Sequence, residues 1–188
     1  LREILMQEML SWKQIISSED YYAIPFINAE GYHSKTIAYS IWHIIRIEDI
    51  VVNSLIRDRN EVLFENNFDK EIGADIITTG NELVKQEIAE FSKNLNIEAL
   101  YEYALSVKAS TDEWLKSIHY EDIKKRFGND DKKRISKLGV VSDDEAAVWL
   151  IDYWCNKDIY GLIKMPLSRH WIMHIEAANR IKEKILRS

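Results

Sequence analysis

The chain has 188 residues, of which 46% are hydrophobic and 30% are charged, as in ordinary globular proteins. This composition excludes a disordered, collagen-like or disulfide-stapled chain. The balance of 31 acidic against 25 basic residues gives a net charge of −6, which disfavours binding to nucleic acid or to anionic membranes. Because the chain has only two prolines and six glycines, we expect an all-α fold, with a single domain over residues 1–188.

The sequence also favours a cytoplasmic protein. Its single cysteine, Cys155, cannot form an internal disulfide, which suits a reducing compartment. The longest strongly apolar run without a charge, from Thr36 to Ile45, is about half the length that a bilayer helix requires. The N-terminus lacks a basic-then-apolar signal pattern. We therefore expect no membrane span and no membrane partner.

The spacing of apolar residues predicts helices along most of the chain. In chain order, these cover about residues 2–16, 34–57, 74–94 and 97–118, then a helix that opens at a capping box of Ser142 and Glu145, and a last helix over residues 167–186. Pro166 is expected to separate the last two, because an interior proline removes a backbone donor and suits the first turn of the following helix. The helix over residues 34–57 is apolar around most of its circumference, so we expect it at the centre of a bundle.

Residues 119–141 lack helical periodicity and are locally basic. Their lysines and arginines are interrupted by Asp130 and Asp131. This pattern favours a solvated surface connection over a patch that contacts phosphates. We assign no function to this segment.

The last predicted helix carries His170 and His174. At about 100° per residue, their spacing places both imidazoles on one face, where one ion could contact both. The same stripe contains Leu167, Ile181 and Ile185, so the two histidines are expected to face the interior. Buried imidazoles need hydrogen bonds or a cation, since an unpaired buried polar group costs about 1–3 kcal/mol. From this pair alone, hydrogen-bonded core histidines and a metal site both remain open.

His43 is the expected third ligand. It lies in the most apolar predicted helix, where a polar side chain likewise needs a partner. Three neutral imidazoles would leave a divalent ion with an open coordination position, which is typical of catalytic rather than structural sites. Such a donor set suits zinc, nickel, iron and copper, and we favour zinc or nickel over iron.

Three segments carry a resemblance to a known family. They are residues 40–48 (SIWHIIRIE), residues 100–116 (LYEY followed by TDEWLK), and residues 170–178 (HWIMHIEAA). In this order they resemble the DinB/YfiT-like metalloprotein family. The resemblance implies a four-helix bundle with a long crossover connection and extra short helical segments, and it implies that His43, His170 and His174 are the metal ligands. The family's usual Arg-Gly-Gln after the last histidine is Ile-Glu-Ala here, at residues 175–177.

Similar proteins with known activities include thiol-dependent S-transferases and a mycothiol-dependent isomerase. The resemblance thus implies a divalent ion that activates a low-molecular-weight thiol or a water molecule for attack on a small-molecule substrate, as in a thiol S-transferase or a hydrolase. The alternative is a non-catalytic, metal-binding or stress-related bundle that acts through dimerisation or partner binding. A homodimer is compatible with either, because helical bundles with apolar outer faces commonly pair.

Other residues receive simpler interpretations. Glu48 lies about 140° around the helix from His43, so a salt bridge is favoured over a place beside the ion. Arg169 is expected on the surface, and Cys155 is expected to be buried and unreactive. His33 lies in an irregular segment, which argues against a ligand role. Four tryptophans are candidates for the wall of the pocket or for the core: Trp42, Trp149, Trp154 and Trp171.

Overall fold

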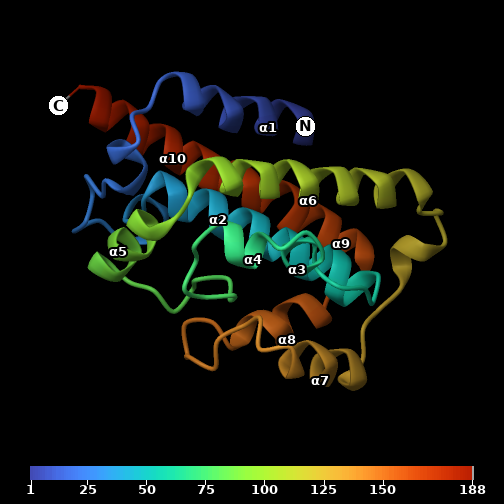
Figure 1. The fold of residues 1–188 in the computed structure, drawn as a ribbon. Helices are drawn as coiled ribbons and strands as arrows, with labels where there is room; N and C mark the ends of the chain where they lie inside the picture. The colour runs from blue at the N-terminus through green and yellow to red at the C-terminus, as the bar shows by residue number, and fades with distance from the viewer. Residues whose placement is uncertain (188) are drawn as a thin grey trace.

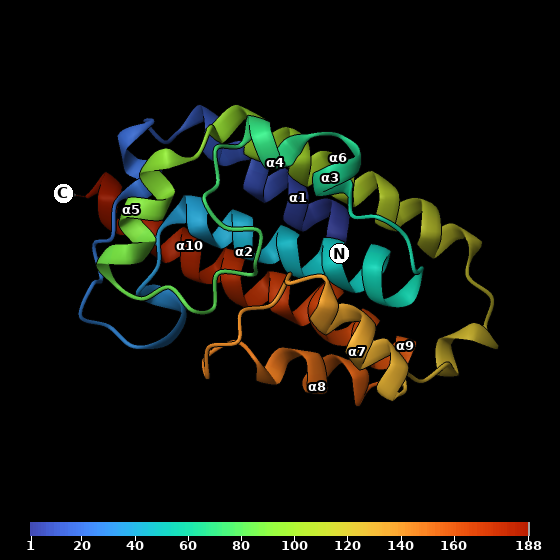
Figure 2. The same cartoon turned by 60° about the horizontal axis from the view of Figure 1, so that its bottom comes forward.

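A computed structural model describes residues 1–187, and within this range it contains helices and no strand. The expected all-α fold is therefore confirmed. Four helices lie side by side and form a bundle (Figures 1 and 2). They are α1 (Arg2–Ser11), α2 (Ile37–Asp49), α6 (Ile97–Ser117) and α10 (His170–Leu186). All residues of α2 are buried, as expected for the central helix.

Shorter helices connect and flank the bundle. They are α3 (Val62–Glu65), α4 (Phe68–Glu71), α5 (Gln86–Asn94), α7 (Asn129–Lys137), α8 (Trp149–Cys155) and α9 (Ile159–Lys164). Two π-helical segments adjoin the long helices, Ile50–Ile56 after α2 and Met165–Arg169 before α10. Pro166 lies in the second of these, so the predicted interruption between the last two helices is present.

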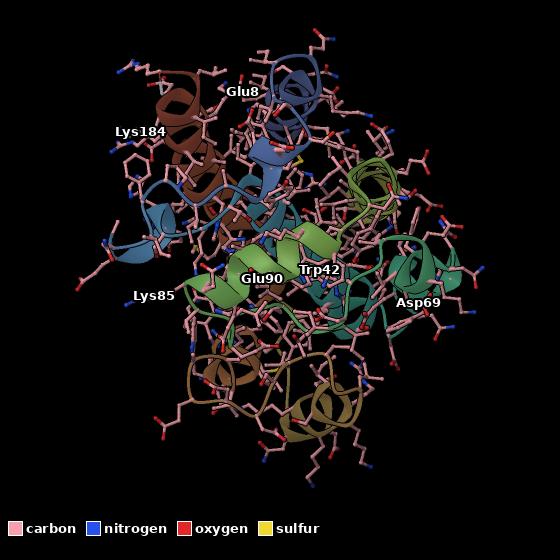
Figure 3. The ribbon with its side chains drawn as sticks, turned by 60° about the vertical axis from the view of Figure 1, so that its left-hand side comes forward. Glu8, Trp42, Asp69, Lys85, Glu90 and Lys184 are labelled. Atoms are coloured by element: carbon pink, nitrogen blue, oxygen red, sulfur yellow. The ribbon has the colours of Figure 1, made fainter. Side chains whose placement is uncertain are left out.

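The buried side chains form two apolar clusters. The first fills the space between α1, α2, α5, α6 and α10, and the second joins the π-helical segment Ile50–Ile56 to α7, α8 and α9. Trp42 lies in the first cluster and is fully buried, whereas Lys85 and Glu90 are exposed. The charged side chain of Lys184 lies at the outer edge of the molecule (Figure 3). Helices α7 and α8 form a layer beside the bundle (Figure 1). The candidate site lies where this layer meets the bundle.

The helix predicted over residues 74–94 is wrong in its first half. Only α5, from Gln86 onward, is helical, and residues 74–85 form an irregular loop. Gly73 and Gly80 adopt φ of +73° and +78°, a left-handed conformation that interrupts a right-handed helix. The carbonyls of residues 77–80 in this loop accept hydrogen bonds from side chains of α2.

The prediction that residues 119–141 form an irregular connection is also partly wrong. They contain α7, whose first turn is stabilised by the Asp131 carboxylate accepting from the amide of Gly128. Arg134 attaches α7 to the bundle by donating to the carbonyls of Ser54 and Leu55. The expected helix start at Ser142 is wrong as well, because α8 begins at Trp149.

No helix between residues 1 and 187 has both the length and the apolar character needed to cross a bilayer.

Candidate metal centre

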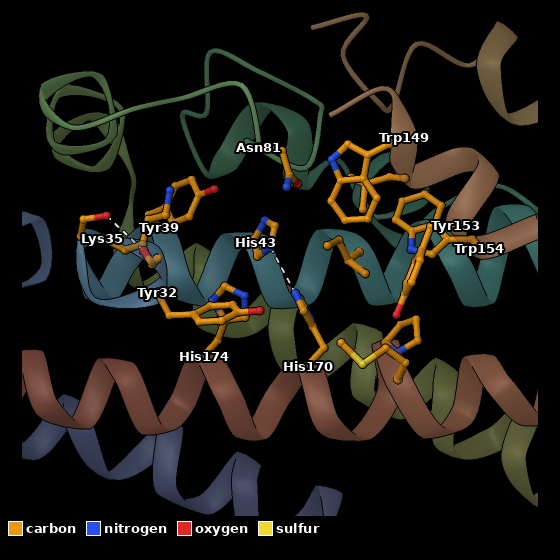
Figure 4. A pocket seen from close by; sticks show the side chains of 16 residues that line it. Tyr32, Lys35, Tyr39, His43, Asn81, Trp149, Tyr153, Trp154, His170 and His174 are labelled. Atoms are coloured by element: carbon orange, nitrogen blue, oxygen red, sulfur yellow. Dashed lines mark hydrogen bonds between the residues drawn. The ribbon is translucent and has the colours of Figure 1, made fainter. Parts of the chain in front are cut away.

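The structure brings together the three histidines that the sequence singled out. His43 extends from α2, and His170 and His174 extend from the facing side of α10 (Figure 4). One ring nitrogen from each lies within 4.8 Å of the other two, and the Nε2 atoms of His43 and His170 are 3.2 Å apart. The three side chains are 3–8% exposed. This arrangement is compact enough to hold one metal ion.

A hydrogen bond fixes the tautomer of His43. Its Nδ1 atom lies 2.8 Å from the carbonyl oxygen of Thr79. A carbonyl can only accept, so Nδ1 carries the proton and Nε2 keeps its lone pair. Nε2 is the atom that faces His170. The bond therefore directs the donor nitrogen of His43 towards the other two rings, as second hydrogen bonds do for metal-bound histidines.

The other two histidines lack such partners. The Nδ1 atoms of His170 and His174 are buried without a hydrogen bond to any described residue. Burial lowers the pKa of His43 to about 4, and it lowers the pKa of His170 and His174 well below the usual value. All three rings are therefore neutral at pH 7 and have lone pairs to donate. A cluster of neutral donors with unsatisfied buried nitrogens fits a cation.

Side chains of α2 hold the loop that bonds to His43. Four residues on one face donate to four successive carbonyls, those of residues 77–80. The donors, from the N-terminal to the C-terminal end of the face, are Tyr39, Trp42, His43 and Arg46. The ring of Tyr39 also stacks on that of His43, with centroids 5.5 Å apart and planes 10° apart. The orientation of His43 is thus set from two directions.

Gly80→Ala tests this support. A Cβ on Gly80 would lie 3.0 Å from Cε2 of Tyr39, at a residue whose φ is +78°. The matched control is Gly139→Ala, because Gly139 has a φ of +66° and open space around it. We expect roughly 1–2 kcal/mol of destabilisation from the backbone in both variants. Gly80→Ala should lose about 1 kcal/mol more from the displaced Tyr39, as measured by urea unfolding. Equal losses would contradict the close packing of the loop on Tyr39.

A cavity of about 420 Å³ opens above the histidines. Its size is that of a site for a small molecule. Figure 4 shows its two sides, with Tyr32, Lys35 and Tyr39 on one side of His43 and three aromatic residues of α8 on the other. The lining residues are Gly31, Tyr32, Ser34, Lys35, Tyr39, His43, Ile47, Asn81, Trp149, Leu150, Tyr153, Trp154, Met165, Pro166, His170 and His174.

The other residues weighed from the sequence lie outside this cavity or on its wall. Glu48 is fully buried, and its Oε2 atom lies 2.5 Å from an Nη atom of Arg2. The predicted salt bridge is therefore confirmed, and Glu48 is not solvated. Arg169 is exposed, as expected. Trp149 and Trp154 line the cavity. Two tryptophans belong to the core instead, Trp42 and Trp171.

Cys155 is buried, as expected, and burial raises the pKa of its thiol to about 11. The thiolate, which is the reactive form, is therefore scarce at pH 8. We expect iodoacetamide to alkylate native Cys155 at least about tenfold more slowly than the same residue in urea-unfolded protein. Mass spectrometry of quenched time points measures both rates. Comparable rates would show that the thiol is exposed or activated in the folded protein.

Several residues of the site could not be identified from the sequence. Tyr32 packs edge-on against His174 with ring centroids 4.7 Å apart, and Lys35 lies on the cavity wall. Thr79 contributes a main-chain carbonyl, which leaves no signature in a sequence. Tyr39 offered a signal, because it precedes His43 by four residues and thus shares its helix face. His33 is not part of the histidine cluster.

Comparisons with known proteins give the fold. No family profile and no curated protein sequence matches the chain significantly. Among solved structures, a conserved protein from Enterococcus faecalis is similar, with a TM-score of 0.69 and 12% sequence identity. The match covers 100% of this chain and 94% of that one. At this identity the likeness supports a shared helical architecture and no more.

Proposed function

We propose that this protein is a metal-dependent enzyme of the DinB-like class, with His43, His170 and His174 as the ligands of one divalent ion, most suitably zinc or nickel. The observation that carries the proposal is the meeting of three neutral, buried imidazoles within 4.8 Å at the floor of a cavity. The hydrogen bonds of the cluster agree with it, because they leave the Nδ1 atoms of His170 and His174 without a protein partner among the described residues.

The reaction that we propose is transfer of a thiol to an electrophilic small molecule, or hydrolysis in which water replaces the thiol. In the transfer, a carbon–sulfur bond forms, the leaving group departs with the electron pair of its bond, and the thiol proton passes to solvent. A divalent ion held by the three histidines would make a thiol or a water molecule more nucleophilic at neutral pH, since a bound cation lowers the pKa of either.

The chain's own residues would orient and shield this reaction. Thr79 and Tyr39 hold the ring of His43, and Tyr32 holds that of His174. Trp149, Tyr153 and their apolar neighbours form a wall against which an electrophile can pack with little water. The orienting contacts precede substrate binding, so the donor atoms need little rearrangement.

One observation favours a second candidate, a metal-binding module without turnover. Among the described residues that line the cavity there is no aspartate or glutamate, so no carboxylate is placed to act as a general base. Such a module would act through a partner or through a second copy of the chain.

A paired rate measurement tests the proposal. Tag-free protein is stripped with a chelator and loaded with Zn²⁺ or Ni²⁺. Thiol transfer is assayed with glutathione, cysteine or 2-mercaptoethanol as the thiol and 1-chloro-2,4-dinitrobenzene as the electrophile. Hydrolysis is assayed with p-nitrophenyl acetate. We expect turnover that depends on the metal and is lost in His170→Ala. The control is His119→Ala, because His119 is an exposed histidine outside the cluster. Metal-loaded protein with no rate above that of His170→Ala in any assay would favour the second candidate.

A further inference from the structure

Lys35 gives the cavity a positive charge. The remaining lining residues comprise three histidines, whose rings are neutral, and side chains that carry no charge at pH 7. Lys35 lies two residues before α2 and is half-buried, with its ammonium 4.9 Å from the ring centroid of Tyr39. An aromatic face attracts a cation without neutralising it. The wall of the cavity therefore has a net positive charge.

This charge has no acidic partner within the described part of the chain. Burial lowers the pKa of Lys35, and no carboxylate acts against this decrease. The charge also reaches the histidines, because it adds to the effect of burial in lowering the pKa of His43. An ammonium that is partly desolvated and has no counter-ion is a favourable partner for a bound anion.

The opposite side of the cavity is apolar. Trp149 and Tyr153 face it from α8, with Trp154 beside them (Figure 4). Further apolar side chains line the cavity: Ile47, Leu150, Met165 and Pro166. Trp149 is 48% exposed, which is high for so large an apolar residue and leaves its ring accessible to a ligand. The cation and the apolar wall lie on opposite sides of His43 (Figure 4).

We propose that the cavity selects an anionic small molecule with an apolar body, which pairs a carboxylate with Lys35, packs its apolar part against Trp149 and Tyr153, and places the bonds between these ends over the histidines. A monoanionic carboxylate matches the single ammonium, whereas a phosphate dianion would leave one charge without a partner. That the ligand reacts at the bonds between its carboxylate and its apolar body rests on the proposed function. The preference for an anion rests on Lys35.

Binding to metal-free protein separates these two points. The probes are 4-phenylbutanoate, its neutral amide and 4-phenylbutylamine, which share one apolar body and differ in charge. Isothermal titration of chelator-treated protein at millimolar probe concentrations is expected to rank the carboxylate first, the amide second and the amine last. Lys35→Met should weaken the carboxylate roughly tenfold and leave the amide unchanged, whereas Lys35→Arg should retain the preference.

One variant controls for the loss of a lysine charge, and another tests the apolar end of the cavity. Lys124→Met is the matched control for charge, because the Lys124 ammonium also lies over a tyrosine ring, that of Tyr120 at 5.8 Å, outside the cavity. We expect it to bind all probes as the wild type does. Trp149→Ala should weaken the carboxylate and the amide by the same factor, since it removes apolar contact and no charge.

Three results would overturn the inference: binding of none of the probes, equal affinity for the carboxylate and the amide, or a carboxylate preference that survives Lys35→Met. Tighter binding of 4-phenylbutyl phosphate than of the carboxylate would overturn the assignment of a monoanion. If the protein prefers the carboxylate but fails to bind Zn²⁺ or Ni²⁺ when these ions are added, the proposed function is contradicted and the anion site is supported. Metal binding without this preference would contradict the inference alone.

Discussion

His170→Ala is expected to lower the affinity of the protein for Zn²⁺ by more than about 100-fold, because changes to groups that merely orient a ligand already cost roughly 10–100-fold. The same loss is expected for His43→Ala and His174→Ala, since each removes one of three donors that lie within 4.8 Å of one another. Competition with a fluorescent chelator measures the affinity, and elemental analysis of dialysed protein measures the stoichiometry. We expect one ion per chain in the wild type.

Thermodynamic linkage gives a second readout of the same site. A ligand that binds only the folded state at 100 times its dissociation constant stabilises that state by about 2.7 kcal/mol. Zn²⁺ should therefore raise the unfolding free energy of the wild type and of His119→Ala, and should leave His170→Ala unchanged. A Zn²⁺ affinity that is equal in the wild type and all three alanine variants would show that the ion binds elsewhere.

Arg46→Met is expected to destabilise the fold by about 3–5 kcal/mol, the usual cost of leaving buried charges without their partner. The Arg46 guanidinium is fully buried and lies 2.8 Å from a carboxylate oxygen of Glu61 and 3.5 Å from one of Asp49. It also donates to the carbonyl of Ile77, which lies in the loop that bonds to His43. The substitution keeps much of the side-chain volume, so the loss reports charge and hydrogen bonding. Urea unfolding followed by circular dichroism measures it.

Arg180→Met is the matched control for this variant. Arg180 pairs with Glu176 on the surface of α10, where ion pairs contribute about 0–1 kcal/mol. A loss in Arg46→Met no larger than in Arg180→Met would contradict a structural role for the buried network. If the network also positions the loop, the zinc affinity of folded Arg46→Met should fall, whereas that of Arg180→Met should not.

The parts of the fold that the sequence predicted are those with regular apolar spacing. The helix predicted over residues 34–57 corresponds to α2 together with the π-helical segment Ile50–Ile56, and the helix predicted over residues 97–118 corresponds to α6. The histidine stripe on α10 was found for the same reason. The proximity of these histidines to His43 was predicted from a second principle, that a polar residue in an apolar helix has a polar partner.

The errors arose where tertiary contacts decide the local structure. In residues 74–85 the spacing of Ile76 and Ile77 relative to Leu83 and Val84 suggests a helix. Left-handed Gly80 and the bonds to α2 make the segment a loop instead. In α7 only Ile135 is buried, so apolar periodicity could not reveal this helix. The sequence did not indicate that Lys35 lies in the cavity, because nothing in the sequence around it distinguishes it from a solvated surface lysine.

The hydrogen bonds between α2 and residues 77–80 make α2 more sensitive to substitution than its acceptor residues. Every acceptor is a main-chain carbonyl, present whatever the side chain, whereas every donor is a particular side-chain group of α2. Ile77 can therefore be exchanged for many other residues with little effect, since its own side chain is 38% exposed. Saturation mutagenesis should thus find position 77 permissive and the donor positions of α2 intolerant, whereas Gly80 is restricted by its left-handed backbone and Thr79 by its burial.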